Sequence, residues 1–105
     1  MAKERILIVD DEKNIVSSLT SILSDEGYEV SMSGDGVEAL ELIQKDPPDL
    51  VILDIWLPGM DGIEFAKRLR ANSITKNIPV IMLTAKNEED NKIKVHQMFQ
   101  MSQAF

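Results

Sequence analysis

The chain has 105 residues, enough for one compact domain, and its 18 acidic and 11 basic side chains give a formal net charge of −7. Because it contains no Cys, disulfides and thiolate metal sites are excluded. The negative charge argues against direct binding of nucleic acid, or electrostatic attachment to a membrane, by this domain, since both need a basic surface.

Strand and helix patterns alternate from the start of the chain. Ile6–Val9 is a continuous aliphatic run, typical of a strand covered on both faces. The run is too short for a signal-peptide core or a membrane span, so we expect a cytoplasmic protein. Residues 12–26 have helical spacing, and Gly27 is suited to end that helix in the left-handed conformation. The apolar side chains of this helix are Ile15, Val16, Leu19, Ile22 and Leu23.

The next two elements are a half-buried strand and a capped helix. Residues 28–32 alternate in polarity, which favours a strand at the edge of a sheet. Asp35 followed by Glu38 is typical of a capping box, and the helix is predicted to run to about Lys45. Its predicted buried side chains are Val37, Leu40 and Ile43. After two prolines, residues 50–53 form the third predicted strand.

The second half of the chain repeats the alternation. Residues 63–70 are predicted to form a helix, with Phe65, Ala66 and Leu69 facing inward, and residues 80–83 form a fourth strand. Residues 87–90 resemble the acidic first turn of a helix, which would continue from Asn91 to Phe105. This order predicts a single α/β domain over residues 1–105: a doubly wound parallel sheet with helices on both faces.

Acidic side chains follow two of the predicted strands. Asp10 and Asp11 come after the first strand, and Asp54 ends the third. In a parallel α/β sheet, ligands bind outside the carboxyl ends of the strands. Three carboxylates gathered there would repel one another without a cation, and Mg²⁺ prefers oxygen ligands of this kind. Because Asp can form an acyl phosphate, one of these carboxylates is also a candidate phosphoryl acceptor.

Three motifs on the first, third and fourth predicted strands carry a family resemblance. They are Ile-Leu-Ile-Val-Asp10-Asp11-Glu12, then Asp49-Leu-Val-Ile-Leu-Asp54-Ile-Trp-Leu-Pro58-Gly-Met-Asp61-Gly62, and Pro79-Val-Ile-Met-Leu-Thr84-Ala85. Together, over about residues 4–94, they resemble the receiver domain of two-component response regulators, including the chemotaxis receivers. The resemblance implies a flavodoxin-like strand order, 2-1-3-4, for the strands present here.

The resemblance also implies a role for each residue of the acidic group. Asp54 would accept a phosphoryl group from a phosphohistidine of a sensor histidine kinase. Asp11 would bind Mg²⁺ directly, and Asp10 would hold the ion partly through water. The Asp54 carboxylate and the backbone carbonyl of Trp56 would complete the protein ligands.

Two further residues are implied at the end of the fourth strand. The Thr84 hydroxyl would bind the phosphoryl group and report phosphorylation by moving toward Asp54, while the Ala85 amide would bind the same oxygens. Because the domain would form and hydrolyse its own acyl phosphate, the resemblance implies a switch and not an enzyme with turnover.

Each of these residues also has an ordinary structural interpretation. Asp10 and Asp11 are common residue types at a strand end and a helix N-cap. Asp54 is also compatible with a simple turn, and Thr84 with a strand end by propensity. At the level of function, the rival is a phosphorylation-independent interaction or assembly module on the same scaffold. A phosphohydrolase would need a second acid two residues after the nucleophile, where this chain has Trp56.

The chain departs from the family after about Lys94. The fifth strand of the family, which carries a Lys that contacts the phosphoryl group, is not recognisable here. Without it, the fourth strand would leave an exposed sheet edge. Three explanations are open: a truncated or frameshifted receiver, a natural variant whose last helix covers the edge, or self-association. We favour self-association through the fourth-strand edge and residues 87–105.

Overall fold

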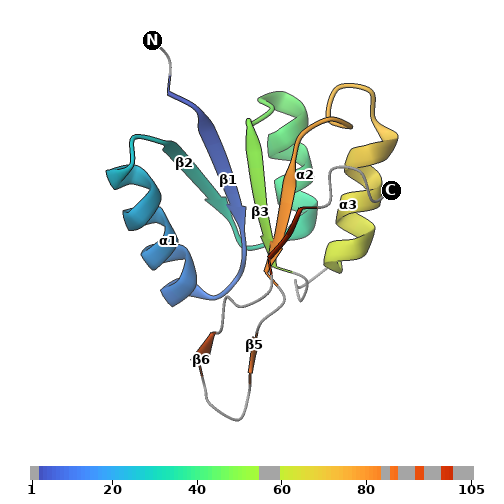
Figure 1. Ribbon diagram of the computed structural model, residues 1–105. Helices are drawn as coiled ribbons and strands as arrows, with labels where there is room; N and C mark the ends of the chain where they lie inside the picture. Colours follow the sequence, from blue (N-terminus) through green and yellow to red (C-terminus); the bar gives the residue numbers. More distant parts are fainter. Residues whose placement is uncertain (1–2, 55–59, 84–85, 88–91, 94–97, 101–105) are drawn as a thin grey trace.

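The computed structural model describes residues 3–54, 60–83, 86–87, 92–93 and 98–100. Its centre is a sheet of four parallel strands, and a fifth strand runs antiparallel to them at one edge (Figure 1). In the order of the sheet, the strands are β2 (Glu29–Ser33), β1 (Arg5–Val9), β3 (Leu50–Asp54), β4 (Val80–Leu83) and β7 (Met98–Gln100). The predicted parallel order 2-1-3-4 and the edge position of the second strand are confirmed.

Helices cover both faces of the sheet. Helix α1 (Lys13–Asp25) packs on one face, and α2 (Gly36–Lys45) and α3 (Gly62–Ala71) pack on the other (Figure 1). Successive residues of a strand point to opposite faces, so each strand serves two cores. The α1 core contains Ile6, Ile8, Ile52 and Leu83. The other core contains Leu7, Val9, Val51, Leu53, Val80 and Phe65.

The helix boundaries follow the predicted signals closely. Gly27 has φ +98°, and the amide hydrogens of Gly27 and Tyr28 donate to the carbonyls of Ser24 and Leu23, 3.0 and 3.1 Å away. These are the two hydrogen bonds of a Schellman motif, which requires the left-handed residue at Gly27. At α2, Asp35 Oδ1 accepts hydrogen bonds from the backbone of Val37 and Glu38, 2.7 and 3.3 Å away, so the predicted N-cap is confirmed.

Two side chains that we predicted to face inward are exposed. Ile22 of α1 is 58% exposed and Val37 of α2 is 49% exposed. The buried face of α2 is formed by Gly36, Ala39 and Ile43, which lie three and four residues apart. Val37 is adjacent to Gly36 in sequence and is therefore rotated by about 100° from that face. An apolar residue at the border of a helical face is thus assigned to the core too readily from spacing alone.

The prediction of a fourth helix over the end of the chain is wrong where the structure describes it. Strands β5 (Lys86–Asn87) and β6 (Lys92–Ile93) pair as an antiparallel ribbon, and β7 pairs antiparallel with β4. We had expected an exposed edge at β4, but β7 of the same chain covers it. The free N–H and C=O groups along that edge favour a strand there over a helix. The rest of the predicted helix lies outside the described residues.

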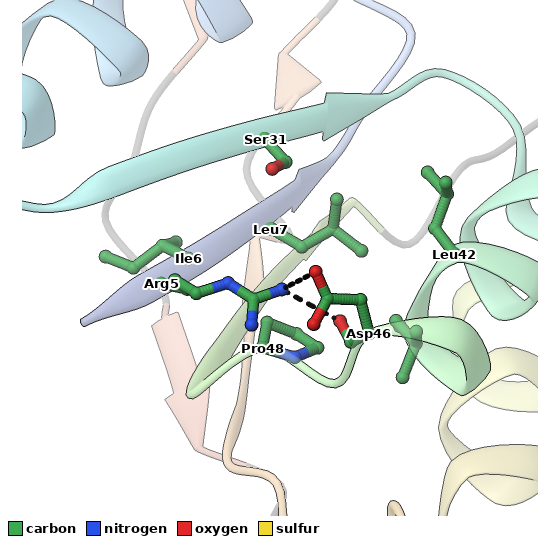
Figure 2. A pocket seen from close by; sticks show the side chains of 8 residues that line it. Arg5, Ile6, Leu7, Ser31, Leu42, Asp46 and Pro48 are labelled. Carbon is green, nitrogen blue, oxygen red and sulfur yellow. Dashed lines mark hydrogen bonds and ion pairs between the residues drawn. The ribbon is translucent and has the colours of Figure 1, made fainter. Parts of the chain in front are cut away.

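A polar cluster ties the amino ends of the strands together, at the end of the sheet opposite to the acidic residues. Figure 2 shows the Arg5 guanidinium reaching Asp46, with 2.6 Å between Nη2 and Oδ2 and 3.1 Å between Nη2 and the backbone carbonyl oxygen. The Arg5 amide donates to Asp49 Oδ2, 2.7 Å away. Leu42 and Pro48 line a pocket of about 100 Å³ beside this ion pair. Because Arg5 and Asp46 are partly exposed, the pair fixes geometry more than it adds stability.

Helix α3 carries an arginine that should weaken the fold. The three guanidinium nitrogens of Arg70 are buried and have no hydrogen-bond partner among the described residues, and burial lowers the pKa of this group. We expect Arg70→Met to leave stability unchanged or raise it by about 1 kcal/mol, because the apolar side chain removes a poorly solvated charge. Urea unfolding measures this difference.

Arg68→Met is the matched control on the same helix. Arg68 is exposed, and its Nε lies 2.9 Å from Glu64 Oε2, so losing the pair should change stability by no more than about 0.5 kcal/mol. A clear loss of stability in Arg70→Met would show that the guanidinium has a stabilising partner and would contradict this expectation.

Candidate metal centre

Three carboxylates meet at the carboxyl end of the sheet. Asp54 is the last residue of β3, and Asp10 follows the last residue of the neighbouring strand β1. One ligand atom from each of Asp10, Asp11 and Asp54 lies within 4.8 Å of the other two. Asp10 and Asp54 are only 4% and 2% exposed, whereas Asp11 is exposed to solvent. The sheet therefore brings together the three residues that the sequence singled out.

The pleat of the strands explains why these side chains converge. Asp54 is two residues from Ile52, and Asp10 is two residues from Ile8; both isoleucines belong to the α1 core. Alternation therefore directs both carboxylates toward the α1 side of the rim. Parallel pairing of β1 with β3 places them next to one another. A shift of one residue in this register would move one of them to the other face.

Two hydrogen bonds orient Asp10. Its backbone N–H donates to the Ser33 carbonyl oxygen at the end of β2, 3.0 Å away, which extends the β1–β2 pairing by one bond. Its Oδ1 accepts from the Glu12 amide, 2.8 Å away, in a tight turn before α1. The interpretation of Asp10 as a strand-end residue agrees with its place directly after β1 and is compatible with a metal-binding role. Glu12, and not one of the aspartates, is the N-cap of α1.

The charges and the spacing of this group suit a small divalent cation. Two unit negative charges 4 Å apart near a protein surface repel by roughly 4 kcal/mol. One carboxylate oxygen of Asp10 and one of Asp54 lie within 4.8 Å of one another, so a cation between them would offset repulsion of this kind. Mg²⁺ binds oxygen at about 2.0–2.1 Å, so ligands on opposite sides of the ion lie about 4.2 Å apart. Three carboxylate oxygens within 4.8 Å therefore fit around one ion.

The acidic group opens onto a pocket of about 620 Å³ beside α1. Asp10 and Asp11 form one side of it, Ser17 and Thr20 of α1 form another, and Gly34 lies on the connection between β2 and α2. The pocket gives solvent and larger molecules a path to the exposed carboxylate of Asp11.

Three predicted site residues lie outside the described residues: Trp56, Thr84 and Ala85. Conversely, the structure adds Ser33 and Gly34, which the sequence analysis did not select. The sequence contains only a weak indication of these two residues. They are a polar residue and a glycine at the end of the second predicted strand, which was expected to lie beside the first predicted strand. The selection of Asp10 and Asp54 was easier because an acid directly after a buried aliphatic run is unusual.

Comparison with known proteins identifies the family. The model of the response regulator receiver domain matches residues 6–102. This chain belongs to that family. The receiver domain is 46% identical over 90 residues to the sporulation initiation phosphotransferase F of Bacillus subtilis, covering 86% of this chain and 71% of that protein. It is 44% identical over 86 residues to the DNA-binding response regulator MtrA of Mycobacterium tuberculosis, covering 82% of this chain and 36% of MtrA.

Solved structures agree with the fold. A putative response regulator from Chloroflexus aurantiacus aligns with a TM-score of 0.79 and 41% identity, covering 88% of this receiver domain and 75% of that chain. The receiver domain of a sensor histidine kinase from Pseudomonas aeruginosa aligns with a TM-score of 0.77 and 29% identity. The alignment covers 81% of this chain and 70% of that chain. That structure holds a magnesium ion in its active site cleft. The predicted family and fold class are confirmed.

The receiver domain spans little more than a third of the length of several relatives. It covers 36% of MtrA and 37% of the alkaline phosphatase regulator PhoP of Bacillus subtilis. The activities of those longer proteins therefore do not transfer directly to this chain. Within the part of the chain that the structure describes, no helix is long and apolar enough to cross a membrane.

Proposed function

We propose that this receiver domain accepts a phosphoryl group at Asp54 in a two-component phosphorelay, from a phosphohistidine of a sensor histidine kinase. Mg²⁺ would be held by Asp10, Asp11 and Asp54. The observation that supports the proposal is the convergence of these three carboxylates at the rim of the sheet, with Asp54 almost completely buried. Family membership supports the same reaction class.

The chemistry follows from the position of Asp54. A carboxylate oxygen attacks phosphorus, the new O–P bond forms, and the bond from phosphorus to the donor nitrogen breaks. Bound Mg²⁺ would offset the negative charge on the transferring oxygens. Asp10, held by its backbone and its Oδ1, supplies a fixed ligand direction and limits reorganisation during the transfer. We assign the Trp56 carbonyl to the metal, and the Thr84 hydroxyl and Ala85 amide to the phosphoryl oxygens.

The remaining assignments concern the protein as a whole. We propose that residues 1–105 form one receiver-like domain, atypical after about residue 94, that acts as a switch without enzymatic turnover. Its negative charge supports a cytoplasmic role without direct binding of nucleic acid or membranes by this domain.

Labelling with a small phosphodonor tests the proposal. With Mg²⁺ present, the wild-type domain should gain one adduct that is stable in acid and labile in base, as an acyl phosphate is. Chelation of Mg²⁺ with EDTA should prevent its formation. If the wild type gains no such adduct, phosphoryl acceptance by this form of the chain is wrong.

A phosphorylation-independent interaction or assembly module is the second candidate. It is favoured by the antiparallel β7, which occupies the edge of β4 where the family has a strand carrying a phosphoryl-binding Lys. Titration with Mg²⁺ separates the two candidates. Binding at millimolar concentrations or below supports the receiver switch, whereas no binding supports the assembly module.

We also propose that two copies associate by exchanging β7. This strand has only three residues, pairs with β4 alone in the described sheet, and could pair equally well with β4 of a second copy. Sedimentation velocity over a wide range of concentration should show a reversible dimer. Phe99→Pro should remove the dimer, because proline disrupts strand pairing, and a wild type that stays monomeric throughout would exclude the exchange.

A further inference from the structure

Ser33, at the carboxyl end of the edge strand β2, is one of four buried polar or charged residues in the part of the chain that the structure describes. It is 4% exposed, whereas the other serine of β2, Ser31, is exposed. A hydroxyl buried at a strand end is stable only if it is hydrogen-bonded, so its partners are informative. They connect β2 with the start of α2, and both segments are distant in sequence from Asp10, Asp11 and Asp54.

The Ser33 hydroxyl links β2 to the start of α2. Its Oγ accepts a hydrogen bond from the Asp35 amide, 3.3 Å away, and lies 2.8 Å from Glu38 Oε1 and 3.1 Å from the Asp35 carbonyl oxygen. A hydroxyl has one proton to donate, and the shorter bond to the charged Glu38 is the stronger. Since Asp35 also caps α2, the hydroxyl fixes the connection between β2 and α2 at both of its ends.

The same connection supports the backbone of the acidic residues. The Ser33 carbonyl accepts the Asp10 N–H, 3.0 Å away. A Cβ placed on Gly34 would lie 3.7 Å from Asp11 Cα and 3.8 Å from the Asp10 carbonyl oxygen. A side chain at position 34 would therefore touch the segment that carries two of the three carboxylates, and glycine leaves that space free.

We propose that Ser33 is a positioning residue for the metal centre. Its hydroxyl, bound to Glu38 and to the Asp35 amide, fixes the connection on which the backbone of Asp10 and Asp11 rests. It does not contact the ion or the phosphoryl group. The inference rests on the proposed function, because it assumes that these carboxylates bind Mg²⁺. Groups that orient metal ligands commonly affect affinity by about 10–100-fold, and an effect through the backbone should be smaller.

The test compares Mg²⁺ affinities of four variants by calorimetry, well below their melting temperatures. We expect Ser33→Ala to weaken Mg²⁺ binding roughly three- to tenfold. Glu38→Ala should weaken it in the same direction. Glu38→Gln should bind almost as the wild type does, because its amide oxygen still accepts the hydrogen bond from Ser33. Ser31→Ala, in the same strand but exposed, should show no change.

Amide hydrogen exchange gives a second measurement. The Asp10 amide should exchange faster in Ser33→Ala than in the wild type, whereas amides in α3 should not change. A purely structural role would lower the melting temperature of Ser33→Ala and leave both Mg²⁺ affinity and Asp10 exchange as in the wild type. That result would overturn the inference.

The remaining outcomes are also decisive. Glu38 is exposed, so its two variants should fold even if Ser33→Ala does not, and equal Mg²⁺ affinities for Glu38→Ala and Glu38→Gln would contradict the inference. If the wild type itself binds no Mg²⁺, the proposed function fails, and the inference fails with it. If the wild type binds and no variant differs from it, only the inference fails.

Discussion

Asp54→Asn is expected to abolish phosphoryl acceptance completely while leaving the fold intact. The amide of asparagine is not a nucleophile for phosphorus, and no other carboxylate of the group is both buried and at the end of β3. Asn has nearly the same shape as Asp, so the core around the position should not change. Removing one charge from three crowded carboxylates should also keep stability equal or raise it. The measurements are labelling by a small phosphodonor and the melting temperature.

Asp25→Asn is the matched control for this experiment. Asp25 is exposed at the last residue of α1, far from the carboxyl rim where that helix begins. Its variant should be labelled as the wild type is. Unchanged labelling of Asp54→Asn would place the acceptor on another residue, and unfolding of that variant would show that the carboxylate has a structural role that the geometry does not explain.

The second large effect concerns Mg²⁺ and stability. Binding of Mg²⁺ at a hundred times its dissociation constant should stabilise the wild type by about 2.7 kcal/mol, because only the folded chain brings the carboxylates together. For a domain of this size, the melting temperature should rise by roughly 10 °C. Asp11→Asn should abolish most of this rise, since Asp11 supplies the exposed ligand. Without Mg²⁺, this variant should melt at the same temperature as the wild type or higher.

Thermal melts with and without Mg²⁺ measure the rise in melting temperature for the wild type and for Asp11→Asn. Asp25→Asn should respond to Mg²⁺ as the wild type does, which excludes a general screening of the net charge of −7. An equal rise in melting temperature for Asp11→Asn would remove Asp11 from the metal centre. No rise in any form would remove the metal centre altogether.

The alternating pattern of the chain was sufficient for the architecture up to residue 83. Continuous aliphatic runs such as Ile6–Val9 appear where a strand is buried on both faces, and the helices between them could be placed from spacing and capping residues. The acidic residues were found for a related reason. A carboxylate at the end of a buried parallel strand lies at the rim where such sheets bind ligands, so position in sequence fixes position in space.

The last part of the chain was predicted incorrectly because local pattern does not decide between helix and strand there. Met98–Gln100 is short and compatible with either state, and its pairing with β4 depends on a free sheet edge fifteen residues earlier in the chain. Contact between distant segments outweighed local preference. The exposure of Val37 has a similar explanation. The way α2 packs on the sheet buries Gly36, Ala39 and Ile43 and leaves Val37, at the border of the apolar face, in contact with solvent.

Residue types and their spacing were thus enough to predict the fold up to residue 83 and the three carboxylates, because both follow from periodicity and strand ends. The family was recognised from the resemblance of three motifs. Three-dimensional packing decided how the carboxylates are held. The hydrogen bond from the Asp10 amide to the Ser33 carbonyl oxygen joins residues more than twenty positions apart, through backbone groups that all residue types except proline possess. No residue pattern records such a contact, and it became visible only once β2 lay beside β1.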